Sequence, residues 1–214
     1  MKKFQYLLIV SFVLLIAGCS KDKDENTTTT PSQNSSGITI NSTAQYSIKV
    51  DGNSFARMDG SQNFQGVVSW SASITTPPDS SSTSFGSGLA DNNSPNLGFS
   101  IDIGNITFSG NSVDPAAFKA FIQAGSYSYT PSGNNKVVAV RWADENGNFY
   151  STEWGTGTQT GSTFTITDVQ DAGTVLGHAH VKFKATFNCT LYDFFGSAKT
   201  LTDGVYVGYF ENYN

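Results

Sequence analysis

His178 and His180 are the two histidines of the chain, and their spacing suits metal chemistry. Side chains two positions apart on a strand point to the same face, and a pair of imidazoles there can bind zinc or copper. The alternation around them places the pair on the polar face of a strand with Lys182 and Lys184. Two cations disfavour a metal ion, and the sequence identifies no third ligand. We therefore expect no cofactor, and a metal-handling site with the candidates His178 and His180 is the alternative.

Trp142 and Trp154 have the chemistry of platforms for stacking sugars. Aromatic residues make up 13% of the chain, and such rings are found both in cores and on exposed surfaces. The two tryptophans flank one expected hairpin, away from its turn, so they are placed to be neighbours across its strands. Both are candidates for glycan binding.

The sequence contains no motif that predicts an enzyme. A serine elbow of the form Gly-x-Ser-x-Gly and a zinc motif of the form His-Glu-x-x-His are both missing. Cys189 falls in an alternating strand pattern, where a cysteine is expected as a small buried hydrophobe. We therefore expect a non-catalytic protein with no catalytic residues.

Cys19 carries the most specific chemical signal. Lys2 and Lys3 precede an apolar run of about a dozen residues, which is shorter than the ~20 residues that span a bilayer. The run ends in Leu15-Ile16-Ala17-Gly18-Cys19, which resembles the lipobox of bacterial lipoproteins. The resemblance implies cleavage after Gly18, a diacylglycerol on the Cys19 thiol and acylation of the new amino terminus. Two or more acyl chains anchor a protein stably, whereas one gives marginal binding.

The residues after Cys19 are expected to contain a localisation signal followed by a tether. Lys21-Asp22-Lys23-Asp24-Glu25 resembles the signal that sends some Bacteroidota lipoproteins to the outer face of the outer membrane, and a solvated spacer on the periplasmic face is the alternative. Residues 26–37 have no apolar side chain, so we expect them to be disordered. The predicted organisation is a signal peptide over residues 1–18, the lipidated cysteine and tether over 19–37, and one domain over 38–214.

The composition favours one class of fold and excludes one class of partner. Charged residues are only 14% of the chain and glycines number 21, which favours a β protein with many turns. Loss of the two lysines of the signal peptide leaves 10 basic and 17 acidic residues, a net charge of −7. Since nucleic acids require concentrated positive charge, we expect no nucleic acid partner.

Alternating apolar and polar residues predict strands over most of the domain. The predicted strands cover residues 44–50, 67–74, 97–103, 125–129, 136–142, 149–154, 163–167, 178–192 and 205–210. Residues 75–96 are expected to be a long exposed loop, and Asp203-Gly204 a turn. Asp114 suits a helix N-cap and Pro115 its first turn, which predicts one short helix. Eight or more short strands predict an all-β fold, an antiparallel β-sandwich with a barrel as the alternative.

Several strand and turn segments, taken in order, resemble a group of small uncharacterised Bacteroidota lipoproteins. The segments are Asp51-Gly52-Asn53-Ser54-Phe55, Gly125-Ser126-Tyr127, Phe164-Thr165-Ile166-Thr167, Phe183-Lys184-Ala185-Thr186-Phe187 and Asp203-Gly204-Val205-Tyr206-Val207. The resemblance implies the same cellular location and the same fold, and it implies no particular activity. We therefore expect a membrane-anchored lipoprotein of the outer membrane whose domain binds a partner protein or a glycan.

Overall fold

The computed structural model describes residues 37–61, 63–73, 81–94, 98–110, 112–129 and 137–213, and for residues 69–73 it describes the backbone alone. Cys19 and residues 21–25 therefore lie outside the described residues, as do the signal peptide and the tether up to residue 36. None of the described residues forms a helix with the length and apolar character needed to cross a membrane.

The described residues form an antiparallel β fold with one short helix. The strands are β1 (Gln45–Val50), β2 (Asn53–Met58), β3 (Phe64–Ser73), β4 (Ser81–Asp91), β5 (Gly98–Phe108), β6 (Gly125–Tyr127), β7 (Val137–Ala143), β8 (Phe149–Ser151), β9 (Thr163–Val175), β10 (His178–Tyr192) and β11 (Ala198–Asn212). They pair in the order β2-β1-β11-β10-β8-β7-β5-β4-β3, and β9 pairs with both β10 and β6 beside this path.

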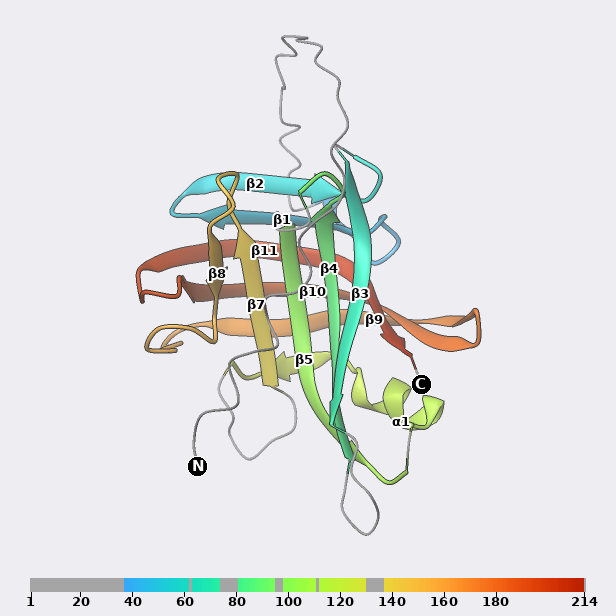
Figure 1. Ribbon diagram of the computed structural model, residues 1–214. Helices are drawn as coiled ribbons and strands as arrows, with labels where there is room; N and C mark the ends of the chain where they lie inside the picture. The colour runs from blue at the N-terminus through green and yellow to red at the C-terminus, as the bar shows by residue number, and fades with distance from the viewer. Residues whose placement is uncertain are drawn as a thin grey trace, which may run out of the picture. The chain divides into compact units, whose positions relative to one another are not determined.

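This sheet curves until it is nearly closed into a barrel, which confirms the all-β prediction. β1, β11, β10 and β9 form one layer, and β7, β5, β4 and β3 cross it steeply in a second layer (Figure 1). A hydrogen bond of 2.8 Å between the Ser87 Oγ and the Tyr206 hydroxyl joins β4 to β11 in the buried interior. The expected sandwich and its barrel alternative therefore describe two aspects of one curved sheet.

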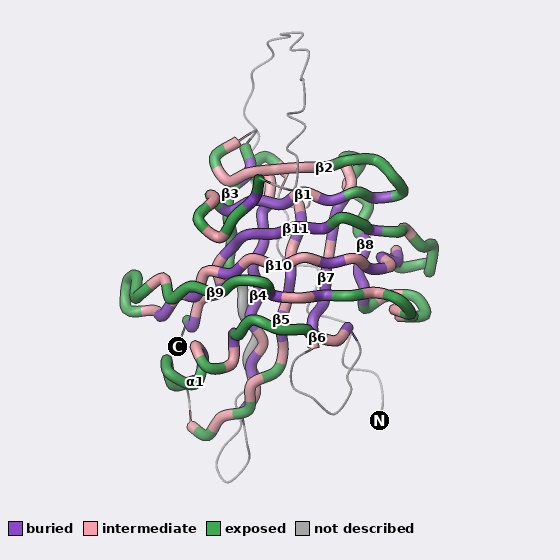
Figure 2. The backbone as a smooth tube through the Cα atoms, turned by 180° about the vertical axis from the view of Figure 1, so that it is seen from behind, coloured by how far each residue is buried: buried purple, intermediate pink, exposed green. Residues whose placement is uncertain are grey.

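Aromatic rings fill the space between the layers. Buried and half-buried residues alternate along β10, as expected for a strand with one face in the core (Figure 2). On its inner face, the Phe183 ring stacks on Phe210 at 4.2 Å between centroids, and Phe187 stacks on Phe99 at 5.5 Å. Because these rings are buried, the interior is a packed core.

The prediction of a loop over residues 75–96 is wrong, because β4 occupies much of it. Its inward positions alternate apolar and small polar side chains, among them Phe85 and Ser87, so the apolar period is hidden. A Cβ atom on Gly88 would lie 2.8 Å from the carbonyl oxygen of Phe99, so the close approach of β5 requires glycine there. Serine and glycine in this strand therefore serve packing.

The predicted turn at Asp203-Gly204 is also wrong, because both residues lie inside β11. Asp203 has a φ of 52°, and the pairing of β11 with β10 shifts register between Phe187 and Cys189. A β-bulge of this kind uses the residue types of a turn without reversing the chain.

The helix prediction is confirmed by α1 (Pro115–Phe121). The Asp114 side chain accepts a hydrogen bond of 3.0 Å from the Ala117 amide, which caps the first turn. Phe118 is buried, and its ring lies 4.8 Å from that of Phe85. The helix therefore packs its apolar face on β4.

Candidate functional site

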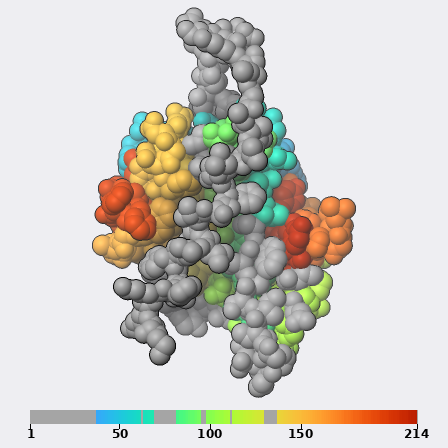
Figure 3. All heavy atoms as spheres, viewed as in Figure 1, coloured from blue at the N-terminus to red at the C-terminus, as the bar shows by residue number. Residues whose placement is uncertain are grey.

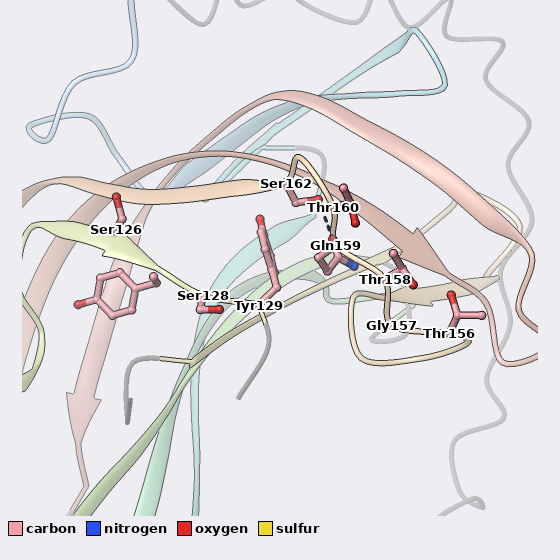
Figure 4. Close-up of a pocket in the computed structure, with 10 residues that line it drawn as sticks. Ser126, Ser128, Tyr129, Thr156, Gly157, Thr158, Gln159, Thr160 and Ser162 are labelled. Atoms are coloured by element: carbon pink, nitrogen blue, oxygen red, sulfur yellow. Dashed lines mark hydrogen bonds between the residues drawn. The ribbon is translucent and has the colours of Figure 1, made fainter. Parts of the chain in front are cut away.

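A polar hollow of about 770 Å³ lies between the end of β6 and the loop that joins β8 to β9. Residues 126–129 line one side, and residues 156–160 with Ser162 line the other (Figure 4). We call residues 152–162 the β8–β9 loop. The volume falls within the range of sites that bind small molecules, about 300–1,000 Å³.

The described lining of this hollow is uncharged. It consists of serine, threonine, tyrosine, glutamine and glycine. Burial raises the pKa of Tyr127 above its usual value, against a smaller lowering by the hydrogen bond to Gln123. Burial also raises the pKa of Tyr129, and the neighbouring Cys189 adds to the increase. Both phenols are therefore neutral at physiological pH, and hydroxyl and amide groups dominate the surface of the hollow.

Hydrogen bonds to β10 hold the β8–β9 loop in place. The Gln159 side chain donates to the Thr190 carbonyl at 2.7 Å and accepts from the Thr190 amide at 3.1 Å. The Tyr192 hydroxyl donates to the Thr158 carbonyl at 2.8 Å. These bonds satisfy buried groups of the loop, so the hollow is formed in advance of any ligand.

Four exposed hydroxyls at the hollow are free to bind a ligand. Within the described part of the chain, the side-chain hydroxyls of Ser126, Thr156, Thr158 and Thr160 make no hydrogen bond, and all four residues are exposed. Each hydroxyl can donate one hydrogen bond and accept two. The hollow therefore offers a set of neutral donors and acceptors on both sides.

One aromatic ring of this loop and two from the turn between β10 and β11 form what we call the aromatic tip: Trp154, Phe194 and Phe195. Trp154 is half-buried at the start of the loop, whereas Phe194 and Phe195 are 80% and 91% exposed. The Trp154 and Phe194 ring centroids are 6.3 Å apart, and those of Phe194 and Phe195 are 5.9 Å apart. The turn that carries the two phenylalanines projects from the surface near the β8–β9 loop (red-orange, left in Figure 3).

Asp193 stabilises the turn between β10 and β11. Its carboxylate accepts hydrogen bonds from the amides of Phe195 at 2.9 Å and Ser197 at 2.7 Å. Partial desolvation acts to raise the pKa of Asp193, but these bonds, with that of Gly196, together lower it below its usual value. The phenylalanines are therefore held outward by an ordered turn. Exposed apolar groups in a cluster usually mark a binding surface.

Of the two tryptophans predicted as glycan candidates, only Trp154 lies at this site. Trp142 is 4% exposed, and its ring packs against Phe55 at 5.1 Å and Tyr150 at 5.7 Å. A ring enclosed in this way offers no open face to a sugar, so the candidate role of Trp142 is corrected to a core role. The predicted pairing of the two tryptophans is wrong too, because β8 ends at Ser151 and Trp142 pairs with Tyr150.

The two histidines contact different partners at the opposite end of β10. The His180 Nδ1 lies 2.9 Å from the carbonyl oxygen of His178, and its Nε2 lies 3.5 Å from the Glu211 carboxylate. The His178 ring instead stacks on Tyr213 at 4.5 Å between centroids. Within the described ranges, no three His, Cys, Asp or Glu side chains come together as a metal site. The two rings therefore make separate contacts, His178 with Tyr213 and His180 with Glu211.

Cys189 is buried beside the hollow, behind Tyr129. It is a free thiol with 3% exposure, as the alternation predicts. Burial raises the pKa of the Cys189 thiol to about 12, against a smaller opposite effect of its hydrogen bond with Tyr129. Because the thiolate is the reactive form, this cysteine is inert at neutral pH.

Sequence reasoning identified Trp154 but missed the residues that line the hollow and both phenylalanines of the aromatic tip. One signal was present: Asp193-Phe194-Phe195-Gly196 sets two large apolar residues between turn residues, where solvent exposure is expected. The loop gave no comparable signal, because threonine, serine and glycine are common in any loop. No protein family, curated protein or solved structure matches this chain.

Proposed function

We propose that this chain is a membrane-anchored lipoprotein whose β domain is a non-catalytic binding module at the outer membrane or cell surface. The anchor is Cys19, within Leu15-Ile16-Ala17-Gly18-Cys19. The ligand site is the polar hollow with the aromatic tip.

The observation that carries the binding role is the ordered display of Phe194 and Phe195 next to a preformed hollow. Exposing two phenylalanine rings to water is unfavourable, at about 25 cal/mol per Å² of apolar surface. The Asp193 carboxylate nevertheless holds the turn that presents them. A rigid apolar surface of this kind favours association, because little conformational entropy is lost on binding.

The chemistry of the hollow supports a role in binding rather than catalysis. Its described lining contains no carboxylate, imidazole, amine or thiol. General acid–base catalysis relies mostly on such groups with pKa values near the working pH. Tyr127 and Tyr129 have pKa values raised away from that range.

Replacement of Cys19 tests the anchor. Wild-type protein is expected in the membrane fraction and to incorporate labelled fatty acid in its bacterial host. The Cys19→Ser variant is expected to lose both properties, because serine provides no thioether for the diacylglycerol. A Cys19→Ser protein that stays labelled and membrane-bound would show that the anchor lies elsewhere.

Photo-crosslinking in living cells tests the binding site while the ligand is still unidentified. p-Benzoylphenylalanine at position 195 replaces one exposed phenyl ring with a reactive relative. The matched control carries it at Leu176, which is 93% exposed at the hairpin tip between β9 and β10. We expect adducts from position 195 and not from 176, whereas equal labelling at both positions would contradict a site at the aromatic tip. Mass spectrometry of the purified adducts distinguishes the two, because a protein partner adds peptides that are not part of this chain, whereas a glycan adds sugar masses that periodate destroys.

A further inference from the structure

We propose that the polar hollow and the aromatic tip bind a neutral oligosaccharide. The inference rests on the proposed function, since it names the ligand of the same site. The three observations that support it are the uncharged described lining, the free hydroxyls on both sides of the hollow and the aromatic rings at the start of the loop that lines it and in the neighbouring turn.

The described lining offers no group for recognition by charge. Phosphate, sulfate and carboxylate groups are bound mainly by Arg or Lys side chains, and ammonium groups by Asp or Glu. The described lining has none of these residues. A ligand of this hollow therefore owes its affinity to neutral hydrogen bonds and to apolar contact.

The free hydroxyls favour a ligand that is itself rich in hydroxyls. Ser126 lies on one side of the hollow, and Thr156, Thr158 and Thr160 lie on the other (Figure 4). An apolar partner would bury these groups without hydrogen bonds, which is unfavourable for each buried hydroxyl. Sugar hydroxyls can donate and accept along the whole length of the hollow, so they remove this cost.

The aromatic tip supplies the apolar contact that a sugar also needs. A pyranose ring has one or more faces of C–H groups, which pack on the negative face of an aromatic ring. Trp154 and Phe194 meet at an interplanar angle of 82°, so their ring faces point in different directions. Such rings beside the hollow suit the sugar units of a chain that extends out of it.

The chemistry at the site favours a glycan over a lipid surface. A membrane would accommodate Phe194 and Phe195, but it would leave the hollow without partners. The hydrogen bonds of Gln159 and Tyr192 fix the loop beside it. An oligosaccharide uses both features at once.

A glycan microarray tests the proposal with full-length protein purified in detergent. The array carries neutral oligosaccharides, such as hexasaccharides of glucose, mannose and xylose, together with sulfated and uronic-acid oligosaccharides. We expect binding to one or more neutral chains. Binding to acidic glycans alone, or to none of the array, would overturn the proposal.

Three variants test whether the glycan binds at the hollow and the aromatic tip. Trp154→Ala is expected to weaken it about tenfold through lost stacking. Thr158→Val keeps the shape of the side chain and removes one hydroxyl, so a loss of about fivefold is expected. Leu176→Ala should bind as wild type does. Equal binding by all three variants would place the glycan elsewhere. If crosslinking at position 195 succeeds and the array fails, the binding module stands and the glycan inference falls.

Discussion

The indole of Trp154 meets the ring of Phe194 edge to face, with centroids 6.3 Å apart and planes at 82°. Trp154 begins the β8–β9 loop, and Phe194 belongs to the turn between β10 and β11. The contact therefore joins the loop that lines the polar hollow to the most exposed aromatic residues of the described chain. A change on either side of this contact is expected to affect the other.

Gly155 is predicted to be essential for the shape of the β8–β9 loop. Its φ is 60°, and an added Cβ would lie 2.9 Å from the Tyr192 ring. Gly155→Ala should lower the free energy of unfolding by about 2 kcal/mol or more, since the left-handed backbone costs about 1–2 kcal/mol and the clash adds to it. It should also weaken ligand binding.

Gly157→Ala provides the matched control for this experiment. Gly157 has a φ of 62°, but open space surrounds the added Cβ. The free energy of unfolding of Gly157→Ala should therefore fall only by the cost of the left-handed backbone. Chemical denaturation gives both free energies, and equal losses in the two variants would contradict the close packing on Tyr192.

The hydrogen bond between Ser87 and Tyr206 is predicted to stabilise the contact between the two layers. Tyr206→Phe should cost about 1 kcal/mol, the net value of one such bond. Ser87→Ala should cost about 1–3 kcal/mol, because it leaves the fully buried Tyr206 hydroxyl unsatisfied. The double variant should cost less than the two single variants together, and additive losses would mean that the two groups do not interact.

Much of this fold follows from local sequence signals. β10 has its predicted bounds, because its residues alternate from His178 to Leu191, and α1 follows from the Asp114 cap and Pro115. β4 was not predicted, because small residues interrupt its apolar alternation, such as Ser87 at the contact with Tyr206 and Gly88 at the close approach of β5.

The candidate site was less accessible to sequence reasoning than the fold. The polar hollow exists only because β6 pairs with β9, as in the contact of Gly125 with Ile166. Gln159 reaches Thr190 in the same way, across elements distant in sequence. Alternation and turn signals describe each segment alone, so they predict neither contact.

Acid is predicted to loosen the aromatic tip. The folded-state pKa of Asp193 is lowered, so its carboxylate contributes stability above the unfolded value of about 3.9. This contribution is lost as the pH falls through the lowered folded-state pKa. The amide resonances of Phe195 and Ser197 should therefore be constant above about pH 4 and shift below it.

Asp193→Asn serves as the control for the acid experiment. Its side-chain oxygen can still accept the two amide hydrogen bonds, but the group does not titrate. The amide resonances should then show no such pH dependence. A wild-type transition at or above the usual Asp pKa of about 3.9 would contradict the bracing role of the carboxylate.

Thiol counting is predicted to distinguish the lipidated chain from an unmodified one. The sequence has two cysteines, and burial raises the pKa of Cys189 to about 12. Native mature protein should therefore react with no thiol reagent at about pH 8, where a buried thiol stays protonated. Denatured protein should expose one reactive thiol, that of Cys189, because the thioether on Cys19 is stable. Two thiols after denaturation would contradict lipidation at Cys19.

In the proposed function, the hollow and the aromatic tip together form the ligand site. Nuclear magnetic resonance with a neutral oligosaccharide selected by the array tests this most directly. Titration should shift the indole N–H of Trp154 and the amides of Thr156, Thr158 and Thr160, and leave that of Leu176 unchanged. Shifts confined to other parts of the domain would contradict the claim.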